Sequence, residues 1–146
     1  TIPIGPVNGS AKGLLETTKD ALFVGVEQAR AGNRLGDVSA AIQERVERDG
    51  YSIIKTLVGH GIGRDMHEDP QVPNHGEPGK GPALQPGMTF AIEPMVNVGG
   101  PEIRVGEDNW AVYSRDGSLA AHFEFTVAVT EDGPRILTPW HEDLDD

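Results

Sequence analysis

The sequence predicts an α+β fold, in which two helices pack on a mainly antiparallel sheet. Apolar residues recur at helical spacing between Leu14 and Val46. Short segments rich in β-forming residues, bounded by turn residues, follow from Tyr51 onwards. Between residues 59 and 87 the chain is rich in Gly, Pro, His and Asn. We interpret this stretch as a long loop region, and loops of that length in a compact protein are usually functional.

The two helices are expected near the start of the chain. Residues 1–9 contain Pro and Gly and are expected to be irregular. The first helix should begin with Ser10 as its N-cap and end at Gly32. Asp37 is expected to cap the second helix, and Gly50 should lie just past its end.

The remaining predicted elements are strands. Residues 51–57 should form one strand, and residues 88–98 another, continuous one. Residues 110–114 and 119–130 are expected to pair as a hairpin across the turn Arg115-Asp116-Gly117-Ser118. After a second turn at 131–133, a last short strand is expected over 135–138. Residues 139–146 are expected to form a solvated acidic tail.

Composition excludes several classes of protein. The chain has 146 residues, 37% of them hydrophobic, which suits a single domain over 1–146 with a packed core. A net charge of −11 makes nucleic acid an unfavourable partner. Because cysteine is absent, a metal ion would need His, carboxylate or water ligands. No signal peptide or bilayer-length apolar run is visible, so we expect no membrane association and a cytoplasmic location.

Two glutamates fall in the middle of predicted strands. Side chains alternate between the faces of a strand, and one face of 121–129 is apolar, made of Ala121, Phe123, Phe125, Val127 and Val129. The opposite face carries His122, Glu124, Thr126 and Ala128. Glu93 likewise lies on the other face from Phe90 and Ile92. A buried Glu needs a partner or a cation. An exposed sheet face would explain both glutamates equally well, and the pattern leaves that choice open.

Two histidines lie in the long loop region. His60 stands between Gly59 and Gly61, and flanking glycines allow the backbone to approach a neighbouring segment closely. His67 follows in the same segment. One His and two Glu can form part of a site for a divalent metal ion, although a lone loop His is more often an ordinary surface residue.

Three longer motifs are much more specific than this spacing. They are GHGIGRDMHEDPQVPN at 59–74, LQPGMTFAIEPMVN at 84–97, and WAV at 110–112 followed by DGSLAAHFEFTVAVT at 116–130. In this order they resemble the histidine loop, the first glutamate strand and the closing hairpin of type I methionine aminopeptidases. The similarity runs from about Val7 to Thr138. It implies the C-terminal half of the pita-bread fold, with two helices on a curved sheet.

The resemblance also implies metal ligands. His60, Glu93 and Glu124 would bind divalent ions, and Glu124 would bridge two of them. Glu93 would also be catalytic, by handling the proton of the attacking water. Mn, Fe, Co, Ni and Zn all suit such ligands, with two ions in a complete site.

The implied substrate contacts lie in two of the motifs. His67 would be catalytic without binding metal, because it would hydrogen-bond the scissile peptide and the tetrahedral intermediate. Met66 and Trp110 match positions that line the pocket for the methionine side chain.

Two departures from the family pattern matter. Phe125 stands where family members have His, but strand alternation places it on the opposite face from Glu124, so we expect the change to be tolerated. The family also takes two metal ligands from a pair of aspartates upstream of the first helix, and residues 1–9 contain no Asp. Three of the five expected protein ligands are therefore present.

The resemblance implies metal-dependent removal of N-terminal methionine from peptides and nascent proteins, by a fragment or by one part of a two-part protein. The alternative is a catalytically impaired pita-bread module that binds peptides or proteins; a proline-directed relative such as a prolidase is a third option. One half of the fold should leave an apolar edge and face uncovered. Besides peptide substrates, the expected partner is the missing N-terminal half or a second copy of the chain.

Overall fold

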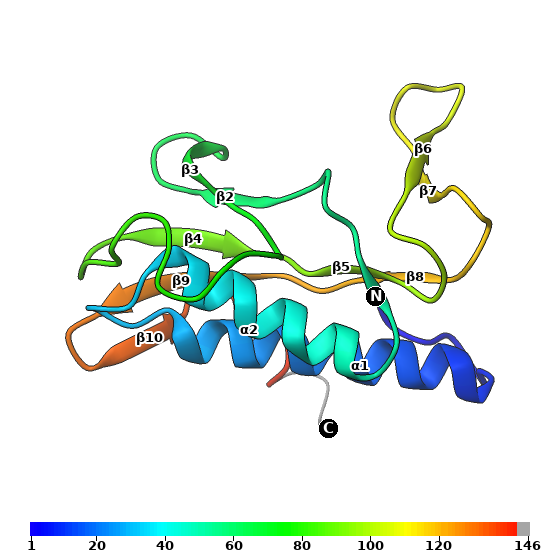
Figure 1. Ribbon diagram of the computed structural model, residues 1–146, viewed down its shortest axis with the longest axis horizontal. Helices are drawn as coiled ribbons and strands as arrows, with labels where there is room; N and C mark the ends of the chain where they lie inside the picture. Colours follow the sequence, from blue (N-terminus) through cyan, green and yellow to red (C-terminus); the bar gives the residue numbers. More distant parts are fainter. Residues whose placement is uncertain (143–146) are drawn as a thin grey trace.

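Two helices lie side by side along one face of the strands in the computed structural model, which describes residues 1–142 (Figure 1). Helix α1 spans Gly9–Gln28. The predicted N-cap at Ser10 is wrong, because the Asn8 side chain accepts a hydrogen bond from the Ala11 N–H at 2.9 Å and starts the helix earlier. The helix also ends before Gly32, which lies in the following turn with a φ of 93°.

Helix α2 spans Leu35–Arg48. The prediction that Asp37 caps this helix is wrong. Asp37 lies in the first turn and accepts a hydrogen bond from the Arg34 N–H at 2.7 Å. An acidic side chain in that place satisfies a free N–H group and favours the positive end of the helix dipole. Gly50 follows the helix with a φ of 80°, as predicted. Neither described helix is both long and apolar enough to cross a membrane.

The strands of the described chain are short and pair in antiparallel fashion. The largest sheet has the order β10 (Gly133–Ile136), β9 (Phe125–Thr130), β4 (Thr89–Ile92), β2 (Gly59–Gly61) and β3 (Glu68–Val72). A second sheet has the order β1 (Ser52–Ile53), β5 (Met95–Asn97) and β8 (Ala120–His122). Strands β6 (Ile103–Val105) and β7 (Val112–Ser114) form a separate hairpin that projects from the rest (Figure 1). The predicted α+β class with a mainly antiparallel sheet is confirmed.

Several predicted strand boundaries are wrong. The strand expected over 51–57 is only β1, and the region interpreted as a loop contains β2 and β3. The turn at 115–118 forms, but it does not join a hairpin, since β7 pairs with β6 and β8 pairs with β5. The last strand, β10, begins two residues earlier than expected.

Each of the two long predicted strands is divided at its glutamate. Glu93 and Pro94 separate β4 from β5, and Phe123 and Glu124 separate β8 from β9. Proline has no N–H to donate to a sheet ladder, which explains the first break. Both extended runs therefore pass from one sheet to the other at the residues predicted to bind metal.

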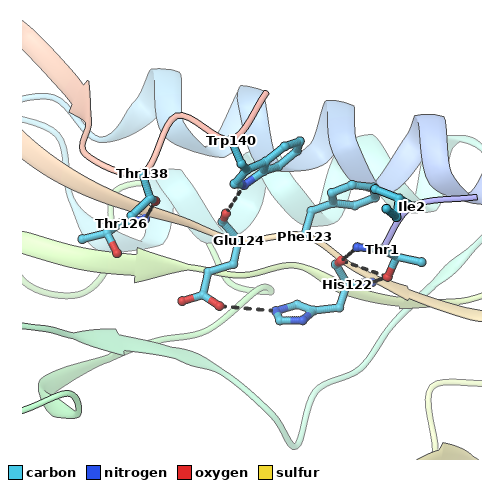
Figure 2. A pocket seen from close by; sticks show the side chains of 8 residues that line it. All are labelled: Thr1, Ile2, His122, Phe123, Glu124, Thr126, Thr138 and Trp140. Carbon is cyan, nitrogen blue, oxygen red and sulfur yellow. Dashed lines mark hydrogen bonds and ion pairs between the residues drawn. The ribbon is translucent and has the colours of Figure 1, made fainter. Parts of the chain in front are cut away.

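The helices bury the apolar face of β8 and β9. The five residues of that face are at most 8% exposed, as predicted from their alternation: Ala121, Phe123, Phe125, Val127 and Val129. Phe23 of α1 packs edge-on against Phe125, with ring centroids 5.4 Å apart. The helices therefore cover this face, and Glu124 points to the side away from them (Figure 2).

Trp140 packs beside the same face. It stacks on Phe125 at 4.8 Å between ring centroids, and His141 meets Phe125 edge-on at 5.0 Å. These first residues of the predicted acidic tail are thus packed against aromatic side chains instead of extending into solvent. Residues 143–146 of that predicted tail lie outside the described residues.

Candidate metal centre

Glu93 and Glu124 lie beside each other at the two strand breaks. On one side of the breaks, Ile92 of β4 pairs with Phe125 of β9. On the other side, β5 pairs with β8. A hydrogen bond of 3.4 Å from the Phe123 N–H to the Pro94 carbonyl links the breaks themselves. The register on both sides therefore holds the two glutamates at the same level of the sheet.

Strand β2 brings His60 to the same place. His60 pairs with Ala91 of β4, two residues before Glu93. A Cβ atom at position 59 would overlap the Ala91 carbonyl oxygen, so Gly59 allows β2 to lie this close to β4. The glycines that flank His60 thus allow the close approach of neighbouring backbone that the sequence predicts.

The His60 ring is oriented by its neighbour. Its Nδ1 lies 2.9 Å from the Gly61 carbonyl oxygen. A carbonyl oxygen can only accept, so Nδ1 donates and a neutral His60 keeps the lone pair on Nε2. Nε2 faces Glu93, with 3.6 Å to Oε1. Metal-binding histidines in proteins commonly use this arrangement, in which one ring nitrogen donates to a carbonyl and the other binds the ion.

The three predicted metal ligands converge. Ligand atoms of His60, Glu93 and Glu124 all lie within 4.8 Å of one another. The side chains of His60 and Glu93 are each 15% exposed. Two carboxylates this close repel each other unless a cation or a proton lies between them. One imidazole and two carboxylates fit a divalent transition metal.

Asn74 contacts the backbone of Glu93. Its buried side chain donates from Nδ2 to the Glu93 carbonyl oxygen at 3.0 Å. This bond occupies a backbone group that the break between β4 and β5 removes from the sheet ladder. Asn74 was part of the histidine-loop motif but received no predicted role. Only the fold, which brings residues 74 and 93 together, reveals it.

Two cavities flank the cluster. One, of about 580 Å³, is lined by His60, His67, Glu93 and neighbouring residues of β3 and β5. The ring centroids of His60 and His67 are 4.2 Å apart there. The predicted catalytic residue His67 therefore lies next to the cluster.

The other cavity, of about 540 Å³, is lined by His122 and Glu124 together with Thr1, Ile2, Phe123, Thr126, Thr138 and Trp140 (Figure 2). It lies along the free edge of β8 and the start of β9. Trp140 donates from Nε1 to the Glu124 carbonyl at 2.6 Å, and the Thr126 N–H donates to Thr138 at 2.9 Å. Among the described residues that line the two cavities none is Lys or Arg, so no fixed positive side chain there balances the glutamates.

The comparisons with known proteins agree with this geometry. The sequence profile of metallopeptidase family M24 matches residues 1–131. The chain belongs to this family. It is 53% identical over 138 residues to the methionine aminopeptidase of Clostridium acetobutylicum, which covers 94% of this chain and 55% of that protein. Identity to methionine aminopeptidase 1 of Bacillus subtilis is 49% over 138 residues, covering 94% and 56% respectively.

Solved structures of M24 proteins share the fold. The methionine aminopeptidase of Thermotoga maritima superposes with a TM-score of 0.91 at 48% identity, over 92% of this chain and 54% of that one. The prolidase of Pyrococcus furiosus gives 0.72 at 25% identity, over 94% and 35%. The predicted pita-bread fold is confirmed. The chain spans about half the length of the curated relatives it matches.

Two residues predicted to bind substrate lie away from both cavities of this M24 chain. Met66 precedes His67 in the connection from β2 to β3 and is 70% exposed. Trp110 lies between β6 and β7 and is 88% exposed. Neither lines the cavities beside the cluster. Their part in a methionine pocket stays a prediction.

Proposed function

We propose that this chain supplies the metal-binding part of a methionine aminopeptidase, which removes N-terminal methionine from peptides and nascent proteins. The convergence of His60, Glu93 and Glu124 carries the proposal. Membership of family M24 and the names of the similar relatives support it. The resemblance of Trp110 and Met66 to methionine-pocket positions favours methionine over proline-directed substrates.

Each site residue has a distinct proposed task. His60, Glu93 and Glu124 would hold divalent ions, for which Mn, Fe, Co, Ni and Zn are all suitable. When bound, such an ion would supply Lewis acidity towards water and the peptide carbonyl. Glu93 would accept the proton of the attacking water. His67, beside His60, would donate a hydrogen bond to the oxygen that becomes negative during attack.

The partial length of the chain leads to a proposal about partners. A complete dinuclear site needs ligands beyond the three that converge here. We propose that they come from an aspartate-bearing N-terminal half or from a second copy of the chain. The cytoplasm, where nascent proteins are made, is the proposed location.

A catalytically impaired module that binds peptides is the second candidate. The observation that favours it is the same incomplete ligand set, because the cavity beside His60 and His67 would still accept a peptide end. The two candidates differ in turnover and not in binding.

An assay of methionine release from a Met-Ala peptide tests the proposal. The purified chain is measured with added Mn²⁺ or Co²⁺, alone and mixed with the upstream half of the Clostridium acetobutylicum relative. We expect weak turnover alone, stronger turnover in the mixture, and loss of both in His60→Ala. His75→Ala, a histidine outside the cluster, is the matched control. Peptide binding without turnover in any mixture would favour the impaired module, and turnover unaffected by His60→Ala would contradict the proposed site.

A further inference from the structure

His122 lies against both glutamates of the cluster. Its Nε2 is 3.4 Å from Glu93 Oε2 and 3.9 Å from Glu124 Oε2. Figure 2 shows the His122 ring and the Glu124 carboxylate facing each other on the same side of the strand. Neither the family resemblance nor the three-residue cluster gives this histidine a role.

The backbone of His122 is fixed on both sides. Its strand, β8, pairs with β5, so that His122 stands opposite Met95. On the outer edge, its N–H donates to Thr1 Oγ1 at 3.1 Å and its carbonyl accepts from the Thr1 hydroxyl at 3.0 Å. The ring lines the cavity of Figure 2 and is 46% exposed. The backbone that carries the ring is therefore held by the fold, while the side chain stays partly exposed.

Glu93 lies between two histidines. Its Oε1 is 3.6 Å from His60 Nε2, and its Oε2 is 3.4 Å from His122 Nε2. Both separations exceed those of direct N–H···O hydrogen bonds, about 2.7–3.2 Å. They match the roughly 3.3–3.6 Å that separates two ligands of one tetrahedral ion when each ligand is about 2.0–2.2 Å from it. The spacing is that of groups arranged around a cation and not of groups bonded to each other.

We propose that His122 is a fourth protein ligand of the metal centre, opposite His60 across Glu93. The proposal rests on the metal site proposed above and extends it. With His122, the described chain supplies two imidazoles and two carboxylates without any upstream aspartate. Four protein ligands are enough for a zinc-type ion. A second nitrogen also shifts the preference from Mn²⁺ towards Co²⁺, Ni²⁺ and Zn²⁺, for which imidazole is a better ligand.

X-ray absorption of the Co²⁺-loaded chain counts the imidazoles directly. We expect two imidazole ligands per bound ion in the unmodified chain and one in His122→Gln. A single imidazole in the unmodified chain would overturn the proposal even if the variant failed to fold. Circular dichroism checks that His122→Gln keeps its secondary structure.

Calorimetric titration with Co²⁺ gives the second readout. We expect the dissociation constant to rise about tenfold or more in His122→Gln, to rise in His60→Ala, and to stay unchanged in His75→Ala. Weaker binding in His60→Ala alone would overturn the fourth ligand and leave the proposed metallopeptidase site standing. Binding that depends on neither histidine, or no binding by the unmodified chain, would overturn both proposals.

Discussion

Glu93 depends on a residue that no local pattern singles out. It stands where β4 ends, so its carbonyl oxygen is not part of a sheet ladder. The buried Asn74 amide supplies the missing hydrogen bond from a segment far away in the sequence. Asn74 Oδ1 is itself buried without a hydrogen-bond partner among the described residues. The Nδ2 bond therefore satisfies the Glu93 carbonyl and is the contact through which Asn74 can position Glu93.

Replacing Asn74 tests this role. Asn74→Ala leaves the Glu93 carbonyl unpaired, and we expect it to lower the free energy of unfolding by about 1–3 kcal/mol. It should also weaken metal binding, because the backbone that carries the Glu93 side chain is no longer held by this hydrogen bond. Urea unfolding and a Co²⁺ titration measure the two effects. The control is Gln85→Ala, an exposed amide. If Asn74→Ala matched this control in both measurements, Asn74 would have no positioning role.

Strand alternation predicted side-chain directions well. Phe125 is fully buried between Phe23 and Trp140, while Glu124 points away from the helices, as its neighbouring position requires. The break at Glu124 does not disturb this, because the alternation continues through it. The roles of Asn74 and His122 could not be predicted in the same way. Each depends on which distant segments meet, and a single sequence does not contain that information.

Elements were predictable where their pattern was long. Both helices have several turns of regular apolar spacing, and only their ends were misplaced, by cap residues a few positions away. Strands β2 and β3 are not predicted from the sequence, because they are short and contain Gly or Pro. Pairing with β4, far along the chain, stabilises β2. The wrong hairpin at 115–118 has the same cause, since a turn sequence does not determine which strands pair across it.

Asp116 is the residue that holds this turn. Its carboxylate accepts hydrogen bonds from the Ser118 and Gly100 backbone N–H groups, each at 2.9 Å. Hydrogen bonds from the Ser118 side chain and from these two backbone groups lower the pKa of Asp116 from 3.8 to about 2. A carboxyl whose pKa is depressed on folding stabilises the fold above its unfolded pKa. That stabilisation is lost as the pH falls from about 4 to about 2.

We therefore expect Asp116→Asn to lower the melting temperature at pH 7. Between pH 4 and pH 2, the melting temperature of the variant should fall less than that of the unmodified chain. Thermal unfolding followed by circular dichroism across this range measures both. Asp132→Asn, at an exposed turn, is the control. Equal pH profiles for the two variants would show that the Asp116 contacts do not form in solution.

At the scale of the whole molecule, the helices cover one side of the strands and leave the candidate metal ligands on the other (Figure 1). The free edge of β8, the break at Glu124 and the start of β9 ahead of its pairing with β10 are covered by Thr1, Trp140 and Thr138. Exposed apolar side chains gather on the β6–β7 hairpin, where Val105 pairs with Val112 and Trp110 lies at the connection. Exposed apolar patches commonly mark contacts with other proteins. A single domain over residues 1–146 stays a prediction.

Self-association is expected for this arrangement. The chain should form dimers at micromolar concentration, through the exposed apolar side chains of the β6–β7 hairpin and not through the covered Phe125 face. Val112→Lys, which places a charge on the exposed hairpin, should shift the equilibrium towards monomer. Analytical ultracentrifugation of both proteins measures the shift. A cooperative, well-folded monomer at high concentration would contradict the prediction.

His60, Glu93 and Glu124 are proposed to hold a divalent ion together. Anomalous diffraction from crystals of the chain grown with Co²⁺ tests it most directly, because the ion is located without reference to activity or partners. We predict an anomalous peak about 2.0–2.2 Å from His60 Nε2 and from a carboxylate oxygen of each glutamate. A saturating Co²⁺ concentration that gives no peak at this position, or a peak only at other residues, would contradict the account.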